Sequence, residues 1–127
     1  MSLLSRDHRK LRAFVLSDDL VMRVYDATRA FPREETFGVT SQMRRAAYSV
    51  PCNIVEGCGR NTEKDFLRFL DNASGSLREL GYLIGLSRRL AYLRAELADD
   101  LEARHDEASR VLAGLIASLR SPPENPR

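Results

Sequence analysis

Apolar side chains recur at every third or fourth residue along four stretches of the chain, which is the period of an amphipathic α-helix. The stretches cover about residues 11–30, 39–58, 63–91 and 95–119. No stretch shows the alternation typical of a β-strand. The connections are short, which favours antiparallel packing of consecutive helices. The pattern therefore predicts an all-α fold, an antiparallel up-down-up-down four-helix bundle.

The second stretch carries its own start, stop and bend signals. Thr40 or Ser41 is the expected N-cap, because a hydroxyl accepts a hydrogen bond from an unpaired N–H of the first turn. Gly57 and Gly59 are expected to end the helix. Pro51 lies inside the apolar pattern and predicts a kink there, since proline removes one intrahelical hydrogen bond.

The other helices are bounded by weaker signals. Phe31-Pro32 should end the first helix, because the residue before proline is pushed out of the α region. Thr62-Glu63-Lys64-Asp65 has the form of a capping box, with Asp where Glu or Gln is usual. The small residues Ala73-Ser74-Gly75-Ser76 would let a neighbouring helix approach closely. Ala91 is expected to be the last member of the buried stripe of this third helix.

Length and composition support one domain of this kind. A chain of 127 residues can bury enough surface for a self-sufficient core. The domain is expected over residues 11–120, after an N-terminal arm (1–10). Residues 121–127 are polar and proline-rich, and are expected to form a disordered tail.

The cysteine spacing and the absence of long apolar runs suggest the compartment. Cys52 and Cys58 are six residues apart on one expected helix, about 9 Å between Cα atoms, beyond the reach of a disulfide. They are therefore expected to be reduced, semi-buried thiols. No apolar run of about 18 residues and no secretory signal are apparent, so no membrane association is expected and the expected location is cytoplasmic.

Candidate catalytic chemistry is sparse. The chain has two histidines, His8 and His105, and neither has a second ligand at metal spacing. Both are expected to be surface residues. No glycine-rich loop follows a strand, and no histidine is placed by sequence to activate a serine. We therefore expect no metal, no cofactor and no enzymatic activity.

Polar side chains form a stripe beside the apolar one on each of the two middle helices. On the second helix the stripe consists of Arg45, Ser49, Asn53, Glu56 and Arg60, and on the third of Asp65, Arg68, Asn72 and Glu79. If the stripes face each other, Ser49, Asn53, Glu56, Asn72 and Glu79 would form a structural polar ladder at a helix or subunit seam. The alternative is a set of solvated surface charges.

The charge distribution suggests a candidate nucleic-acid surface. The net charge is only +2, but residues 1–62 carry ten Lys or Arg against seven Asp or Glu, and the acidic excess lies between residues 96 and 107. The candidate phosphate-binding cations are Arg44, Arg45, Arg60, Lys64 and Arg68. Phosphate contacts need only exposed Lys or Arg. The competing interpretation pairs these cations with Glu56, Glu63 and Glu79.

The second helix is apolar over much of its circumference. Tyr48, Cys52 and Val55 lie away from its main buried stripe. A helix that is apolar on two faces is often covered by a second subunit. This predicts a homo-oligomer.

Several of these segments together resemble one known family. They are Phe31-Pro32, Gly38 to Ala47, Ser49 to Gly57, Gly59-Arg60, Phe66 to Leu70, Gly75-Ser76-Leu77 and Glu79-Leu80. The chain resembles, over about residues 11–119, the four-helix bundle proteins encoded in intervening sequences of bacterial 23S ribosomal RNA genes, sometimes labelled S23 ribosomal proteins. It is also similar to the accessory protein of diversity-generating retroelements, a basic pentameric bundle that binds nucleic acid and a reverse transcriptase.

The resemblance implies a homopentameric four-helix bundle with no assigned catalytic activity. Together with the charge pattern it favours a non-catalytic bundle that binds nucleic acid, structured RNA or an RNA–DNA hybrid. The alternative is a structural or adaptor oligomer whose partner is a protein. The acidic surface of the fourth helix argues against transferring nucleic-acid binding directly from the more basic accessory proteins.

Overall fold

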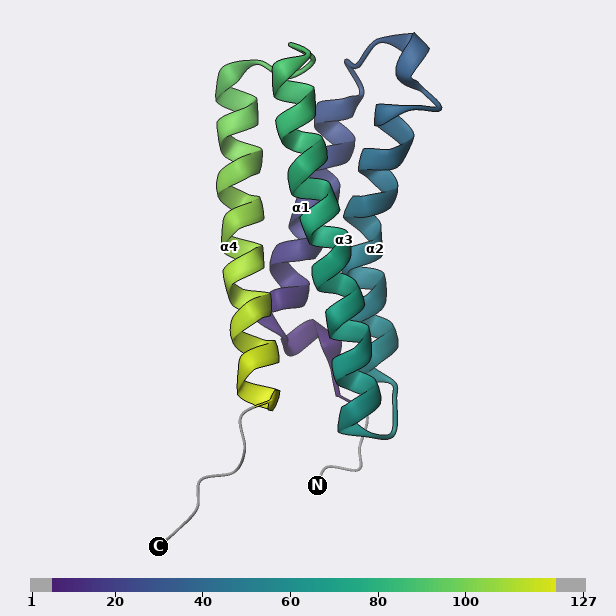
Figure 1. Cartoon of the computed structure of the whole chain (residues 1–127), viewed down its shortest axis with the longest axis vertical. Helices are drawn as coiled ribbons and strands as arrows, with labels where there is room; N and C mark the ends of the chain where they lie inside the picture. The colour runs from purple at the N-terminus through teal and green to yellow at the C-terminus, as the bar shows by residue number, and fades with distance from the viewer. Residues whose placement is uncertain (1–5, 121–127) are drawn as a thin grey trace, which may run out of the picture.

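Four α-helices pack as an antiparallel bundle in the computed structural model, which describes residues 6–120 (Figure 1). They are α1 (Arg12–Thr28), α2 (Val39–Cys58), α3 (Glu63–Arg89) and α4 (Ala95–Arg120). Two 3-10 turns, η1 (His8–Lys10) and η2 (Arg33–Glu35), precede α1 and α2. Residues 6–120 contain no β-strand. The predicted fold class is confirmed, and the expected tail, 121–127, lies outside the described residues.

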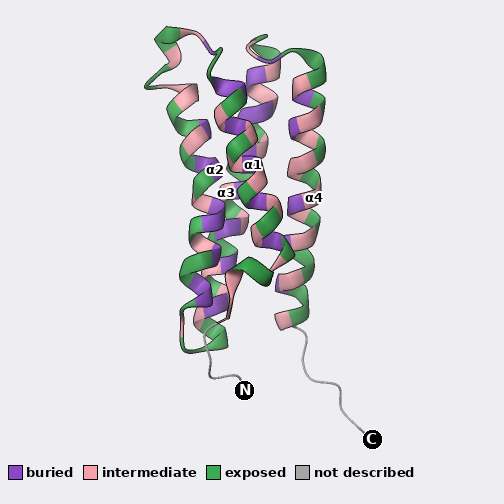
Figure 2. Ribbon diagram, turned by 180° about the vertical axis from the view of Figure 1, so that it is seen from behind, coloured by how far each residue is buried: buried purple, intermediate pink, exposed green. Residues whose placement is uncertain are grey.

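The helices form a closed ring in chain order. α1 packs on α2 and α4, and α3 packs on α2 and α4, with α2–α3 the most extensive pair. Within residues 6–120 no backbone contact joins the diagonal pairs. Buried residues lie along the sides of the helices that face one another, and exposed residues lie along the outer sides (Figure 2). The largest fully buried side chains are Phe66, Leu20, Met43, Ile54, Leu70, Leu80, Ile84, Leu101 and Leu112.

The start of α2 differs from the prediction. Gly38, not Thr40 or Ser41, is the N-cap residue, and it has no side chain to donate or accept. Instead Glu35, from η2, accepts a hydrogen bond from the Val39 N–H through Oε1 at 3.1 Å. A carboxylate at this position also interacts favourably with the positive end of the helix dipole.

Helix α2 ends where Gly57 and Gly59 predicted, whereas the expected kink inside it stays a prediction. The helix runs unbroken through the buried Pro51. Gly57 is inside the helix, and Gly59 is the C-cap with φ −87°, a right-handed conformation open to any residue. The glycines at this end are therefore not needed for a left-handed turn.

The close approach of α2 and α3 occurs at Gly57. A Cβ atom there would lie 2.9 Å from the Cβ atom of Phe69 and 3.1 Å from a ring carbon of Phe66. The sequence had indicated the small residues 73–76. A Cβ atom at Gly75 would meet nothing within 4 Å, whereas the Oγ atom of Ser76 in the same run lies 2.8 Å from that of Ser49 on α2. Packing between these helices therefore depends on a small residue of α2.

The prediction for the start of α3 is confirmed, and the prediction for its end was wrong. Thr62 accepts a hydrogen bond from the Asp65 N–H at 3.1 Å, which confirms the predicted cap. Ala91 is exposed and lies beyond the helix, with φ 62°, so its place in the buried stripe was wrong. The Tyr92 N–H donates to the Ser87 carbonyl and the Ala91 N–H to the Arg88 carbonyl, the pattern of a Schellman motif.

The described part of the N-terminal arm contacts the end of the bundle where α2 passes to α3. The Arg6 N–H donates to the Cys58 carbonyl at 3.1 Å. The Arg6 guanidinium also lies 4.0 Å from the centre of the Phe66 ring. Farther along, the His8 ring meets the Phe14 ring edge to face, with 4.7 Å between centroids.

Candidate nucleic-acid interface

Three of the five candidate phosphate-binding cations lie at the α2–α3 turn. Arg60 comes just after the end of α2, and Lys64 and Arg68 lie in the first two turns of α3. The guanidinium groups of Arg60 and Arg68 lie 4.7 and 4.6 Å from the centre of the Phe69 ring. We call Arg60, Lys64 and Arg68 the basic corner.

The other two candidate cations are far from the basic corner. Arg44 and Arg45 are 16 residues and 15 residues before Arg60 along α2, which is roughly 24 Å at the rise of an α-helix. The sequence had grouped all five on one surface. The structure instead places them towards opposite ends of α2.

Arg44 is held between α1 and α2 by neutral groups. Its Nε–H donates to Thr28 Oγ1 at 2.8 Å, and its guanidinium lies 4.5 Å from the centre of the Tyr25 ring. Arg45, by contrast, is exposed and donates to the side chain of Gln42 at 2.8 Å. Arg44 is therefore fixed in position, whereas Arg45 is a solvated surface cation.

Carboxylate partners were the competing interpretation for these cations. The structure bears out the pairing of Arg60 with Glu56, whereas Arg68 pairs with Asp65 rather than with Glu63 or Glu79. Arg60 pairs with Glu56 at 2.7 Å and Arg68 with Asp65 at 3.7 Å. Among the described residues Arg44, Arg45 and Lys64 have no carboxylate oxygen within 4.0 Å.

The other expected partners lie elsewhere. Glu63 faces Arg6 at 3.9 Å. The exposed Glu79 has no ion pair within residues 6–120.

The predicted polar ladder has one rung between the helices. Ser49 and Ser76 share a hydrogen bond of 2.8 Å between their Oγ atoms, and Asn53 donates to the Ser49 carbonyl of its own helix at 2.9 Å. Asn72 and Glu79 are exposed, and their side chains form no hydrogen bond or ion pair among the described residues. Within a single chain the two stripes therefore lie side by side on the α2–α3 surface, largely solvated.

Most carboxylates of α4 are already paired with arginines. Arg12 of α1 meets Glu107 at 2.6 Å, and Arg88 of α3 meets Asp99 at 2.5 Å and Glu102 at 2.9 Å. The acidic surface expected from the sequence is therefore largely neutralised.

A further four-membered network joins α1 to α4. It consists of Asp19, Arg23, Asp100 and Arg104, with nitrogen–oxygen distances of 2.9 to 3.6 Å. Each arginine contacts both aspartates. Each helix contributes one arginine and one aspartate, so that opposite charges meet across the α1–α4 seam.

An apolar groove lies on the outer surface between α1 and α2. Its volume is about 470 Å³. Most of its lining is apolar, and the lining residues are Phe14, Val21, Tyr48, Pro51, Cys52 and Val55, together with the acidic Asp18 and Glu56. Val15 and Met22 continue the apolar surface on α1 and are 53% and 61% exposed. The three residues that predicted an oligomer thus gather on one exposed face.

The two cysteines differ in environment. Cys52 is exposed in this groove, so the expected semi-burial was wrong for it. Cys58 is buried beneath the N-terminal arm, and that burial raises the pKa of its thiol. Neither forms a disulfide.

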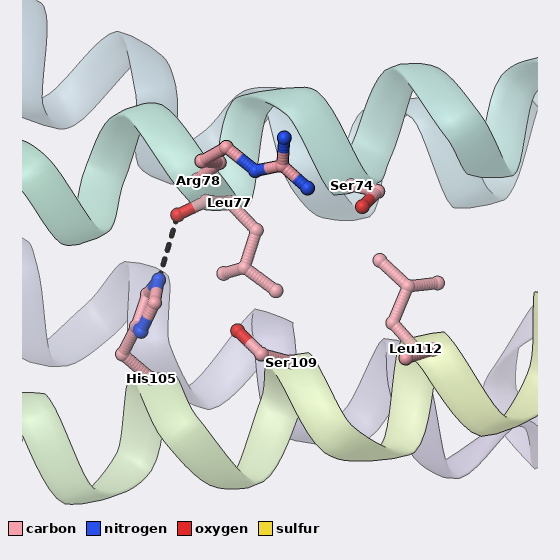
Figure 3. Close-up of a pocket in the computed structure, with 7 residues that line it drawn as sticks. Ser74, Leu77, Arg78, His105, Ser109 and Leu112 are labelled. Atoms are coloured by element: carbon pink, nitrogen blue, oxygen red, sulfur yellow. Dashed lines mark hydrogen bonds between the residues drawn. The ribbon is translucent and has the colours of Figure 1, made fainter.

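His105 is not the surface residue that the sequence suggested. Its side chain is 16% exposed, and its Nε2 lies 2.7 Å from the Leu77 carbonyl oxygen of α3 (Figure 3). Because a carbonyl can only accept, Nε2 carries the proton. A Cβ atom at Gly81 would lie 2.7 Å from the imidazole ring. This glycine, in the middle of α3, is the feature of the sequence that could have indicated a buried ring next to it.

A pocket of about 250 Å³ adjoins this histidine between α3 and α4. Ser74 and Arg78 line it from α3, and Ser109 lines it from α4 (Figure 3). The two ring nitrogens of His105 face the Leu77 carbonyl and, at 3.5 Å, the Asp106 carboxylate. Neither nitrogen bonds a serine hydroxyl, so the pocket lacks the nucleophile–base pair of covalent catalysis.

Residues 6–120 hold no group of three or more His, Cys, Asp or Glu side chains placed to bind a metal ion. In the same part of the chain no helix is both long and apolar enough to cross a membrane.

These features define an antiparallel four-helix bundle whose polar chemistry lies on its outer surface. The chain belongs to the 23S rRNA-intervening sequence protein family, whose model matches residues 9–114. This confirms the family resemblance. The similarity to the retroelement accessory protein stays a prediction.

The fold is shared with a solved structure. A crystal structure of a protein of unknown function from the S23 ribosomal protein family of Bacteroides thetaiotaomicron superposes with a TM-score of 0.76 at 22% identity. The match covers 82% of this chain and 97% of that one. At this identity the likeness concerns the fold alone. No curated protein matches the chain.

Proposed function

We propose that this chain is a non-catalytic, self-associating bundle that binds nucleic acid, either structured RNA or an RNA–DNA hybrid, through cations of α2 and α3. The observation that supports this most directly is the uneven charge pairing. Arg44, Arg45 and Lys64 have no carboxylate within 4.0 Å among the described residues, whereas most acids of α4 are paired. Unpaired surface cations are the groups that phosphate contacts require.

The basic corner adds a feature suited to nucleic acid. Arg60 and Arg68 lie over Phe69, so their guanidinium planes are held at the surface beside an aromatic ring. Arginine binds phosphate oxygens through a planar fork of N–H donors, and pre-orientation reduces the entropy lost on binding. The ion pairs of Arg60 and Arg68 are exposed, and a phosphate can compete with such pairs because they are weak.

Self-association is the second part of the proposal, and the apolar groove supports it. An exposed apolar face of this kind marks an interaction surface. A second copy is the occupant that we propose. Assembly into a ring would repeat each chain's unpaired cations, so that several phosphates of one nucleic acid could be bound at once.

An adaptor oligomer with a protein partner is the second candidate function. The same apolar groove favours it, because a protein partner could use it as well as a second copy. The two candidates differ in what the arginines do. In an adaptor, Arg45 and Arg60 would serve assembly rather than phosphate binding.

The test is a titration of labelled structured RNA, an RNA–DNA hybrid and duplex DNA at two or more salt concentrations. We expect affinity to fall steeply with salt, and Arg45→Gln to reduce the slope of log K against log salt by about 1. Arg110→Gln, at an exposed position of α4, removes the same charge away from the candidate surface and should leave the slope unchanged.

Light scattering of the same samples separates the two candidates. If Arg45→Glu and Arg60→Glu lower affinity while the oligomer keeps its mass, the nucleic-acid proposal stands. Loss of the oligomer in these variants supports the adaptor instead. Absence of binding to all three nucleic acids at low salt rejects nucleic-acid binding.

A further inference from the structure

A polar pocket lies at the corner where α1 passes to α2, around η2. Its volume is about 400 Å³. The lining residues are Thr28, Arg29, Phe31, Pro32, Arg33, Thr36, Thr40 and Arg44. Three of them are arginines, three are threonines and none is acidic. We call this site the corner pocket.

Arg44 forms one wall of the corner pocket and is already fixed in position. It is half-buried, and its contacts are a hydroxyl, a ring face and, at 3.5 Å, the Tyr25 carbonyl. All of these partners are neutral, so they orient the guanidinium without cancelling its charge. Because a guanidinium has five N–H donors, donors remain for a ligand.

The other two arginines differ in how far they are neutralised. Arg29 pairs with Asp26 at 2.6 Å, so this pair adds little net charge. Arg33 is exposed and has no carboxylate within 4.0 Å among the described residues. With Arg44, the corner pocket therefore has two uncompensated positive charges.

The acidic groups nearby, Glu34 and Glu35, form no ion pair with Arg33 or Arg44. Glu35 is engaged at both oxygens, by the Val39 N–H at 3.1 Å and by the Tyr92 hydroxyl at 2.8 Å. Glu34 is exposed. Neither belongs to the pocket lining.

The threonines have separate parts in the corner pocket. The Thr28 hydroxyl donates to the Val24 carbonyl at 2.8 Å, and the Thr36 hydroxyl donates to the Arg33 carbonyl at 2.7 Å. These two hydrogen bonds stabilise the end of α1 and the loop around η2. The Thr40 hydroxyl has no such bond within residues 6–120 and is half-buried at the pocket wall, so it is available as a donor.

We propose that the corner pocket binds a phosphomonoester group. Two uncompensated arginines match a group with a charge of nearly −2 at pH 7 and several strong acceptor oxygens. The Arg44 fork would hold two of these oxygens, and Arg33 and the Thr40 hydroxyl would bind the rest. The buried Phe31 and the half-buried Pro32 limit water on the remaining side.

This inference deepens the proposed function, because Arg44 belongs to both. It differs in the ligand, which is a terminal phosphate rather than the continuous backbone of a nucleic acid. Such a group can be the phosphorylated end of an RNA or a small phosphorylated molecule. The shared chemistry is one phosphomonoester group at one end of the bundle.

The test is a titration of the whole chain with inorganic phosphate at constant ionic strength, observed by amide and arginine Nε–H NMR signals. We expect saturable shifts confined to residues 28–44. Arg33→Gln should weaken binding about tenfold or more, because it removes a charge-assisted hydrogen bond. Its side chain is exposed and unpaired within residues 6–120, so the fold should be unaffected.

Two further variants complete the design. Thr40→Val preserves the shape of the side chain and removes the hydroxyl, and should also weaken phosphate binding. Arg110→Gln removes one positive charge from α4 and should not. No saturable shift in the wild-type protein, or equal weakening by Arg33→Gln and Arg110→Gln, would overturn the corner pocket.

An RNA arm identifies the source of the phosphate. If a 5′-phosphorylated oligonucleotide binds more tightly than its 5′-hydroxyl form, and Arg33→Gln removes the difference, the ligand is an RNA end. If phosphate binds in the corner pocket but no RNA binds, the inference stands for a small phosphorylated molecule and the proposed function fails. If RNA binds but phosphate causes no saturable shift, the proposed function stands and the inference about the corner pocket fails.

Discussion

Gly57 is the residue at which α2 and α3 come too close for a larger side chain. A Cβ atom would lie 2.9 Å from that of Phe69, a side chain anchored on the helix. We expect Gly57→Ala to destabilise the chain by about 1–3 kcal/mol. Gly75→Ala, at an exposed position with nothing within 4 Å, should stabilise it by about 0.5–1 kcal/mol. Urea unfolding midpoints of the two variants test this, and changes of equal sign would contradict it.

Glu35 links stability to pH at the same scale. A hydrogen bond from the Tyr92 hydroxyl and a second from the Val39 N–H lower the pKa of this carboxyl below its ordinary value of 4.5. Because this pKa is lower in the folded chain than in the unfolded chain, the charged carboxylate stabilises the fold at pH values above its unfolded-state pKa. The stabilisation is lost as the pH falls through the folded-state pKa.

The Glu35 contribution should therefore vanish only in acid. We expect Glu35→Gln to be less stable than the wild-type protein by a constant amount from pH 8 down to about pH 5, with the difference shrinking below that. Urea unfolding at a series of pH values measures it. Asp7, whose pKa Arg9 lowers by hydrogen bonding, contributes to both proteins equally. A difference that grows as pH falls would refute the role assigned to Glu35.

Residue-level prediction from the sequence succeeded where the determining contacts are local. Thr62 caps α3 through a residue three positions away, and that spacing is visible in the sequence. Glu35 caps α2 only because η2 turns its side chain back, and its second bond reaches Tyr92, 57 residues away. His105 likewise becomes buried through a carbonyl of another helix. Such contacts depend on how helices are rotated, which one sequence does not reveal.

At the scale of elements, the end of α3 contains a residue in an unfavourable conformation. Ala91 has φ 62° at the Schellman position that glycine usually occupies, and a left-handed conformation costs an alanine roughly 1–2 kcal/mol. We expect Ala91→Gly to stabilise the chain by about 1 kcal/mol and raise Tm by about 3–5 °C. Thermal unfolding tests this. Ala103→Gly, at an exposed helical position of α4, should instead be destabilising.

The positions of the helices could be predicted closely from the hydrophobic periodicity, and the observed helix ends show why. The first helix was expected over residues 11–30 and spans Arg12–Thr28. The fourth was expected over 95–119 and spans Ala95–Arg120. Apolar stripes determine where helices pack, and Phe31-Pro32 stops the first. The end of α3 was placed too late because Ala91 fits the stripe in sequence but leaves the helix after Leu90.

At the scale of the whole molecule, the candidate cations occupy two places rather than one. Arg44 contributes to the corner pocket, whereas Arg60, Lys64 and Arg68 form the basic corner at the other end of α2. Residue types and the helix on which they lie were predictable. Their separation of roughly 24 Å follows from the rise per residue along α2. The carboxylates that neutralise Arg60 and Arg68 are local, Glu56 and Asp65, whereas the neutral groups that hold Arg44 come from α1.

The apolar groove leads to a prediction about assembly. Tyr48 is 44% exposed in the groove, and a glutamate there would place a charge in any interface that the groove forms. Burying an unpaired charge is costly, so Tyr48→Glu should dissociate the oligomer while leaving the helical content unchanged. Tyr82→Glu, on the outer face of α3, is the matched control, because Tyr82 is 62% exposed and lies outside the groove.

Sedimentation velocity and circular dichroism measure assembly and fold separately. The wild-type protein and Tyr82→Glu should sediment with the mass of several chains, and Tyr48→Glu with the mass of one. A wild-type protein that sediments as a single chain would reject self-association through this face. The groove would then be left for a protein partner, and the unpaired cations would act one chain at a time. If both variants dissociate, the interface includes the outer surface of α3, where the polar stripes of α2 and α3 lie exposed.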